Sequence, residues 1–181
     1  MKICVFCASS PQVGEPYRSA MTSLGECIAA RGHSLVFGGY DSGLMGIVAH
    51  AVGDNGGKVY GVIPQNVGLF ETRSVYDGFE VFEVADLSAR KDKMCSLADA
   101  YIAGPGGFGT YDELYEVLVE EKLTSRRRKP IGLFDVEGCY QLFEQLTNQM
   151  VSQNLCPESD KFLYAKSPNP EELVQELERR L

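Results

Sequence analysis

Short apolar segments alternate with longer amphipathic ones along the chain. Residues 59–63 (Val-Tyr-Gly-Val-Ile) and 131–134 (Ile-Gly-Leu-Phe) are nearly continuous in apolar side chains, which is typical of strands buried on both faces of a parallel sheet. Neighbouring parallel strands are joined by crossover helices. The alternation therefore predicts an α/β fold, a doubly wound, Rossmann-like parallel sheet with helices on both faces, as a single domain over residues 1–181.

The expected elements follow from this alternation. We expect strands at residues 2–7, 34–37, 58–63, 79–84, 100–103 and 130–134. We expect helices at residues 16–31, 43–53, 87–97, 111–124, 139–152 and from about residue 170. The longest irregular stretch, residues 64–78, is either a lid over a site or a surface connection, and it contains Arg73, a candidate contact to a phosphate or a leaving group.

Three loops of small residues follow expected strands. They are residues 8–10 (Ala-Ser-Ser), 38–43 (Gly-Gly-Tyr-Asp-Ser-Gly) and 104–109 (Gly-Pro-Gly-Gly-Phe-Gly). In this architecture ligands bind at the carboxyl ends of the strands, so we expect the loops to converge on one site. The chain has neither the G-x-G-x-x-G pattern after its first strand nor a Walker-type G-x-x-x-x-G-K-[ST] motif, which disfavours standard dinucleotide and ATP sites.

The third loop predicts a phosphate site. Glycines let the backbone approach an anion, and the following helix presents free N–H groups with a partial positive charge. Thr110 adds a hydroxyl, and Glu113 places a carboxylate one turn further on, where it is available for catalysis. The same residues also fit a capping box, in which Thr110 caps the helix and Glu113 folds back to the Thr110 backbone N–H.

Charge and composition exclude several partners. The net charge of -8 and the pI of about 4.8 disfavour binding to nucleic acid or to an anionic membrane, which both need a basic face. No apolar stretch approaches the roughly 20 residues that span a bilayer, and the N-terminus passes straight into a strand pattern, so we expect a cytoplasmic protein.

The six cysteines are expected to be reduced, because a single domain of this size needs no disulfides and five of them lie in apolar patterns. Cys4 and Cys7 form a C-x-x-C, but their odd spacing within a strand sends the two sulfurs to opposite faces. With two histidines in the chain, we expect no metal site.

Residues 105–113 (Pro-Gly-Gly-Phe-Gly-Thr-Tyr-Asp-Glu) match the P-G-G-x-G-T-x-x-E signature of the LONELY GUY (LOG) family, the cytokinin riboside 5′-monophosphate phosphoribohydrolases. Residues 3–10, 43–46 and 61–64 resemble further family segments, and Arg90-Lys91 with Met94 resembles the R-K-x-x-M element, with Arg90 at the family spacing of 23 residues from Glu113. The chain reads Leu87-Ser88-Ala89 where members commonly read Met-His-Glu.

The resemblance implies hydrolysis of the N-glycosidic bond of a nucleoside 5′-monophosphate to free base and ribose 5-phosphate, by a homodimer without metal or cofactor. Its catalytic pair would be Arg90 and Glu113, with Arg90 holding the phosphate or stabilising the departing base. We expect the subunit contact near residues 87–97, where Leu87, Met94 and Leu97 share a face. The implied substrate- and phosphate-binding residues are Ser9, Gly39, Gly43, Met45, Lys91, Gly106, Gly107, Gly109 and Thr110.

Two other hypotheses on the function remain. One is a nucleotide or cofactor carrier of the same fold without catalytic activity. The other is an amino-acid decarboxylase, which is disfavoured because pyridoxal phosphate chemistry needs a Schiff-base lysine, and Lys91 and Lys93 are expected to face solvent. The sequence leaves the base open among adenine, an N6-prenylated adenine and another purine.

Overall fold

The computed structural model describes residues 1–65, 79–123 and 129–181. Its strands are β1 (Lys2–Phe6), β2 (Ser34–Phe37), β3 (Val59–Pro64), β4 (Glu80–Val84), β5 (Ala100–Ala103), β6 (Ile131–Phe134) and β7 (Tyr164–Ser167). Its helices are α1 (Glu15–Ala30), α2 (Gly43–Asp54), α3 (Leu87–Leu97), α4 (Phe108–Leu123), α5 (Gln141–Ser152) and α6 (Pro170–Arg180), with short 3-10 helices η1 (Val136–Gly138) and η2 (Glu158–Phe162). Arg73 and nearly all of the candidate lid at residues 64–78 lie outside the described residues.

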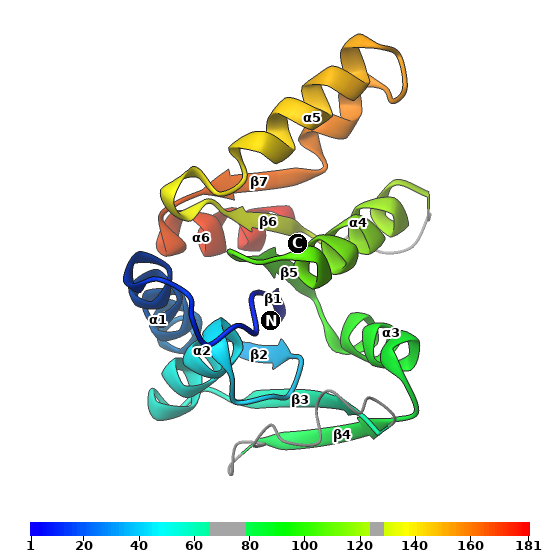
Figure 1. Cartoon of the computed structure of the whole chain (residues 1–181). Helices are drawn as coiled ribbons and strands as arrows, with labels where there is room; N and C mark the ends of the chain where they lie inside the picture. Colours follow the sequence, from blue (N-terminus) through cyan, green and yellow to red (C-terminus); the bar gives the residue numbers. More distant parts are fainter. Residues whose placement is uncertain (66–78, 124–128) are drawn as a thin grey trace.

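The described strands form one sheet in the order β4-β3-β2-β1-β5-β6-β7, and each of these pairings is parallel. The predicted α/β fold is confirmed (Figure 1). The strand order changes direction at β1, where Cys4 lies opposite Val36 of β2 on one side and Tyr101 of β5 on the other. In open α/β sheets such a switch point is where ligands bind.

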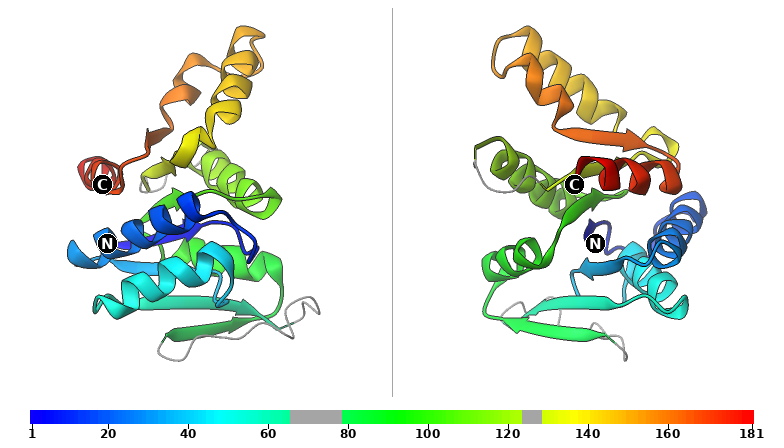
Figure 2. Two further views of the ribbon diagram at one scale, coloured as in Figure 1. Left: turned by 60° about the vertical axis from the view of Figure 1, so that its left-hand side comes forward. Right: turned by 180° about the vertical axis from the view of Figure 1, so that it is seen from behind.

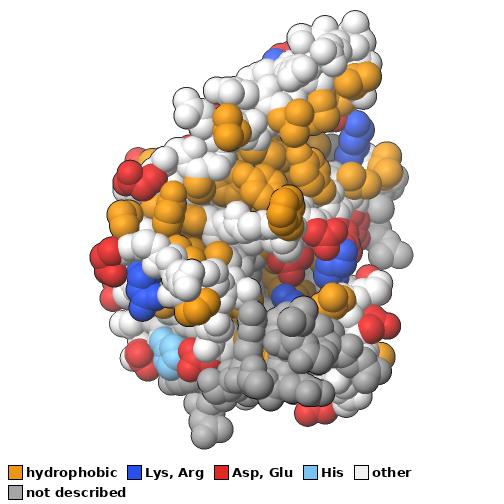
Figure 3. All heavy atoms as spheres, viewed as in Figure 1, with side chains coloured by type: hydrophobic (Ala, Val, Ile, Leu, Met, Phe, Trp, Pro, Cys, Tyr) orange, Lys and Arg blue, Asp and Glu red, His pale blue; other side chains and the backbone are white. Residues whose placement is uncertain are grey.

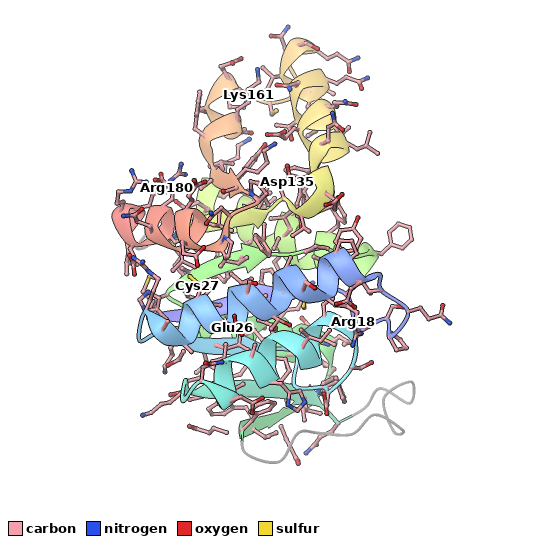
Figure 4. The ribbon with its side chains drawn as sticks, turned by 90° about the vertical axis from the view of Figure 1, so that its left-hand side faces the viewer. Arg18, Glu26, Cys27, Asp135, Lys161 and Arg180 are labelled. Carbon is pink, nitrogen blue, oxygen red and sulfur yellow. The ribbon has the colours of Figure 1, made fainter. Side chains whose placement is uncertain are left out.

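Helices cover both faces of the sheet, and β1 shows how its sequence directs this. Side chains alternate along a strand, so Ile3 and Val5 join the cluster formed with α1, α2 and α6, whereas Cys4 and Phe6 join the cluster formed with α3, α4 and the start of α5. Figure 2 shows the two layers from behind, and Figure 4 shows α1 and α2 side by side over the first face. Both faces of the central strands are buried, as their continuous apolar runs predict.

All six cysteines are free. Cys4 and Cys7 pack into different core clusters, which confirms that their sulfurs lie on opposite faces of the sheet. Burial raises the pKa of both thiols, so they are neutral core side chains at physiological pH. Within the described residues, no helix combines the length and the apolar character needed to cross a bilayer.

The structure differs from the sequence-based expectation in three places. The strand β7 was not predicted, because its four residues include the exposed Lys166 and give no apolar run. The helix α4 begins at Phe108 rather than at residue 111, because glycines delay a sequence-based assignment without preventing the helix. The helix α5 begins at Gln141 rather than residue 139, after η1, in which Glu137 and Gly138 have positive φ.

Candidate active site

The three predicted loops meet at the switch point of the sheet. The backbone N–H of Ala8 donates to the carbonyl of Pro105 at 2.9 Å, which joins the first loop to the third. The N–H of Leu44 donates to the carbonyl of Ala8 at 2.9 Å, and the hydroxyl of Ser42 donates to the carbonyl of Ser9 at 2.8 Å, which join the second loop to the first. Loops far apart in sequence therefore form one hydrogen-bonded rim.

A pocket of about 420 Å³ lies inside this rim, at the carboxyl ends of β1, β2 and β5. Its volume falls in the range of small-molecule sites. The rim supplies backbone and small polar groups, whereas α3 supplies Leu87 and Met94 and α2 supplies Met45. One part of the pocket is thus polar and backbone-lined and another is apolar, as a ligand with a charged end and a planar, less polar end requires.

Arg90 and Glu113, the predicted catalytic pair, meet on the wall of this pocket. Nη2 of Arg90 lies 3.2 Å from Oε1 of Glu113, and the two side chains are each 12% exposed. Arg90 comes from α3 and Glu113 from the second turn of α4, so the packing of these two helices brings them together. The buried Nε of Arg90 has no hydrogen-bond partner within the described structure, which leaves a donor for a bound molecule.

The pKa of the Glu113 carboxyl group lies close to neutral pH. Burial raises its pKa from 4.5 to about 7, and the positive charge of Arg90 opposes part of that rise. A carboxyl group with this pKa exchanges a proton readily at physiological pH, which is the property of a general base or acid. A perturbed group in a pocket also marks a candidate functional residue.

The start of α4 lines one end of the pocket with backbone N–H groups. The backbone N–H of Tyr111 donates to the carbonyl of Gly107 at 3.1 Å, so the N–H groups of residues 108–110 precede the first intrahelical bond and need an external partner. Thr110 therefore lies inside the helix, and the carboxylate of Glu113 turns toward Arg90. The capping-box interpretation is wrong, because the helix begins before Thr110.

Six of the nine predicted binding residues border the pocket: Ser9, Met45, Lys91, Gly107, Gly109 and Thr110. Their contact with a ligand stays a prediction. The other three predicted residues, Gly39, Gly43 and Gly106, lie in the loops but are not among the residues that line the pocket. Gly39 and Gly43 have φ of +82° and +56°, which favour glycine, and a side chain at Gly106 would begin 2.5 Å from Cβ of Thr110.

The two lysines of α3 do not face solvent as the sequence suggested. The ammonium group of Lys91 contacts carboxylates of α4, and Nζ of Lys93 lies 4.3 Å from the ring centroid of Phe82. Both side chains are half-buried, because α3 packs against β4, where Phe82 lies, and the ion pairs of Lys91 reach across to α4.

Tyr140 supports the glycine loop and was missed from the sequence. Its hydroxyl donates to the carbonyl of Gly104 at 2.7 Å, and its side chain is 1% exposed. The sequence carries no signal for this contact, because Tyr140 and Gly104 are 36 residues apart and join only through the packing of η1 and α5 beside β5. The apolar side chains of Met94 and Phe108 were also missed as pocket residues.

Comparison with known proteins agrees with this geometry. A family model described as "Possible lysine decarboxylase" matches residues 45–177. The cytokinin riboside 5′-monophosphate phosphoribohydrolase LOG5 of Arabidopsis thaliana is 39% identical over 177 residues, which cover 98% of this chain and 77% of that protein. The phosphoribohydrolase LOG of Oryza sativa subsp. japonica is 40% identical over 177 residues, which cover 98% of this chain and 72% of that protein.

Solved structures show the same fold at lower identity. The molybdenum cofactor binding protein of Rippkaea orientalis matches with a TM-score of 0.73 at 21% identity, over 98% of this chain and 95% of that one. The molybdenum cofactor carrier protein of Chlamydomonas reinhardtii matches with a TM-score of 0.74 at 19% identity, over 99% and 96% of the two chains. At these identities the likeness concerns the fold alone.

Proposed function

We propose, because the chain belongs to the LOG family of cytokinin riboside 5′-monophosphate phosphoribohydrolases, that it hydrolyses the N-glycosidic bond of a purine nucleoside 5′-monophosphate. The products are the free base, adenine or a cytokinin-type adenine, and ribose 5-phosphate. One observation of the site carries this proposal: a buried carboxyl group with a raised pKa, Glu113, lies one helical turn from a set of backbone N–H groups suited to a phosphate.

The pocket is suited to each part of such a substrate. The N–H groups at the start of α4, with Ser9 and the hydroxyl of Thr110, bind the 5′-phosphate. The ribose lies over Glu113, and the base lies toward the apolar side chains of Leu87 and Met94. Arg90, the one arginine among the described residues that line the pocket, keeps Glu113 in place and contributes positive charge to a site that receives an anion.

The chemistry follows from the transition state. When the bond between C1′ and the base nitrogen breaks, its electron pair leaves with the base, and the sugar acquires oxocarbenium character. An ionised Glu113 stabilises that positive charge. The same carboxylate then accepts a proton from the water whose oxygen bonds to C1′ and passes it to the nitrogen of the departing base, which leaves as the neutral free base, so no metal or cofactor is required in this scheme.

The site does not support the decarboxylase description. Pyridoxal phosphate chemistry needs a lysine free to form a Schiff base. Lys91 is the lysine among the described lining residues, and its ammonium group is already paired with two carboxylates.

A carrier of an anionic cofactor is the second candidate, favoured by the fold shared with molybdenum cofactor carriers. A carrier gains nothing from a carboxylate in the pocket, because that group repels an anionic ligand. Glu113 therefore favours the hydrolase.

We further propose that the chain forms a homodimer through the outer face of α4 and α5, where Figure 3 shows hydrophobic side chains gathered. This outer face comprises the exposed apolar residues Phe108, Tyr115, Val119, Leu123, Leu142 and Leu146. Exposed apolar patches of this kind mark interaction sites. The subunit contact expected on α3 is less well supported, because Met94 is buried in the core and Leu97 packs against it.

For the compartment we propose the cytoplasm, since six free thiols persist best in a reducing environment.

The proposal is tested by incubating the protein with a panel of nucleoside 5′-monophosphates that includes AMP, N6-isopentenyl AMP, GMP and CMP. We expect chromatography to show free purine base and ribose 5-phosphate in equal amounts. Tight nucleotide binding without release of base from any member of the panel would instead support the carrier.

A further inference from the structure

Lys91 lies between two carboxylates of the neighbouring helix. Its Nζ is 3.0 Å from Oδ2 of Asp112 and 2.5 Å from Oε2 of Glu116, and its side chain is 25% exposed. Asp112 and Glu116 are four residues apart on α4, so they present their carboxylates on the same side of the helix. The positive charge of Lys91 is therefore engaged within the protein and is not directed at the phosphate end of the pocket.

This bridge lies beside the catalytic pair. Arg90 and Lys91 are consecutive residues of α3, and both pair with acids of α4. Arg90 pairs with Glu113, and Lys91 pairs with Asp112 and Glu116. A long side chain such as that of arginine holds one geometry only when its surroundings fix it. The two pairings together fix the position of α3 along α4 at the point where Arg90 meets Glu113.

The bridge also balances charge around Glu113. Two cations from α3 face three carboxylates of α4, so without Lys91 a single cation would face all three. Among the described residues, the thiols of Cys4 and Cys7 interact with Glu113 and the thiol of Cys95 interacts with Glu116. Burial raises the pKa of all three thiols, so they are neutral at physiological pH. Lys91 is thus the group that offsets Asp112 and Glu116.

We propose that Lys91 is a positioning residue, which holds the Arg90–Glu113 pair in register and neutralises the two carboxylates beside it, and that it does not bind the substrate phosphate. This inference rests on the proposed hydrolase function. It replaces the role of phosphate ligand that the sequence suggested for Lys91.

The inference has a measurable electrostatic consequence. Burial is the main cause of the raised pKa of Glu113, Asp112 and Glu116 add to it, and Arg90 and Lys91 lower it. Removing Lys91 deletes one of the two lowering influences and leaves Arg90 alone against the two carboxylates that raise the pKa. The pKa of Glu113 therefore moves up, and a larger part of the carboxyl group is protonated at neutral pH.

The test is the pH dependence of kcat and KM for Lys91→Met, with AMP or N6-isopentenyl AMP, whichever the unmodified chain hydrolyses faster. The acid limb is the range in which kcat rises with pH. We expect it to move upward by about one pH unit, so that kcat at a given pH on the limb falls about tenfold. Above the limb, KM should change by less than about threefold. The double variant Lys91→Met with Glu116→Gln removes one unopposed carboxylate and should return the limb at least halfway. Lys91→Arg keeps the charge and should leave it in place.

Lys93→Met is the matched control, because Lys93 lies on the same helix but contacts the ring of Phe82 instead of an acid of α4. It should not move the limb. An increase of KM by tenfold or more with an unmoved limb would show that Lys91 binds phosphate and would overturn the inference, as would a Lys91→Met variant with unchanged kinetics.

A second readout does not depend on turnover. Titration of the Glu113 carboxyl carbon by ¹³C NMR should give a higher pKa in Lys91→Met than in the unmodified chain, and equal values would also overturn the inference. If the unmodified chain releases no base but this shift is present, the proposed hydrolase function fails while the electrostatic role of Lys91 stands.

Discussion

Nη2 of Arg90 lies 3.2 Å from Oε1 of Glu113, although the two residues are 23 positions apart and belong to different helices. Both side chains are largely buried, so the pair is shielded from the solvent that weakens surface ion pairs. Removing either partner of a buried pair leaves the other without compensation. We therefore expect the activity to depend on both residues and on the contacts that hold them together.

The first prediction concerns the charge of Glu113. Glutamine has the same shape as a protonated glutamate, but it cannot stabilise an oxocarbenium ion or accept a proton. We expect Glu113→Gln to lower kcat by at least about 10²-fold, the low end for general acid–base catalysis, in a steady-state assay of base release. A variant that hydrolyses nucleotides at nearly the unmodified rate would contradict the catalytic role.

The difference in stability between the unmodified chain and the same variant should depend on pH. The folded-state pKa of Glu113, about 7, lies above its ordinary value of 4.5, so the stability that this group contributes is present below about pH 4.5 and is lost as the pH rises through 7. Near pH 5 the carboxyl group is mostly neutral, like glutamine, and we expect the free energies of unfolding to agree within about 1 kcal/mol. Urea unfolding of both proteins at several pH values checks this.

The second prediction is the pH dependence of the reaction. If the ionised form of Glu113 is active, kcat/KM for the nucleotide should rise about tenfold per pH unit in the acid range and level off above about pH 7, the pKa of the buried carboxyl. The limb should be absent from the residual activity of Glu113→Gln. A rate that instead falls as the pH rises through 7 would mean that the protonated carboxyl is the active form.

The sequence located the candidate site better than it located the contacts that support the site. Strand and glycine-loop patterns are local, so they indicated β1, β2, β5 and the phosphate end of the pocket, and the family signature indicated Arg90 and Glu113. The ion pairs of Lys91 and the contact between Tyr140 and Gly104 depend on how elements pack across long sequence separations. No local periodicity encodes such contacts, and β7 was missed because an edge strand of four residues has no distinctive apolar pattern.

The third prediction concerns the 5′-phosphate. The N–H groups at the start of α4 interact with an anion and have little to offer a neutral hydroxymethyl group. We expect kcat/KM for AMP to exceed that for adenosine by at least about 10²-fold, and the same for N6-isopentenyl AMP against its nucleoside. Equal values within either pair would show that the glycine loop does not bind phosphate.

The fourth prediction concerns assembly. Light scattering at micromolar concentration should give about 40 kDa, twice the 19.9 kDa of one chain. Leu142 is 75% exposed on the outer face of α4 and α5, so Leu142→Asp places a charge in the proposed interface and should shift the mass toward that of one chain. Leu181→Asp, just after α6, is the control and should leave the mass unchanged. A mass of one chain for the unmodified protein would contradict the dimer.

The fifth prediction tests the alignment of Arg90 without changing any charged residue. A Cβ atom at Gly38 would lie 2.5 Å from Nη2 of Arg90 and 3.1 Å from Sδ of Met45. The end of an arginine side chain moves away from such a contact at little cost to the fold, but it then leaves Glu113. We expect Gly38→Ala to change the melting temperature by only a few degrees, about 1 kcal/mol, while kcat falls by roughly tenfold or more, since small displacements of a positioned group are costly in rate.

The direction of the pH shift identifies the cause of that loss. Arg90 lowers the pKa of Glu113, so moving it away should shift the acid limb of Gly38→Ala to higher pH. Gly53→Ala is the matched control, because a Cβ atom at Gly53 meets its nearest neighbour, Phe79, at an ordinary 3.8 Å, and its kinetics should not change. If Gly38→Ala keeps both the unmodified kcat and the unmodified limb, the contact between Arg90 and Glu113 does not control the reaction.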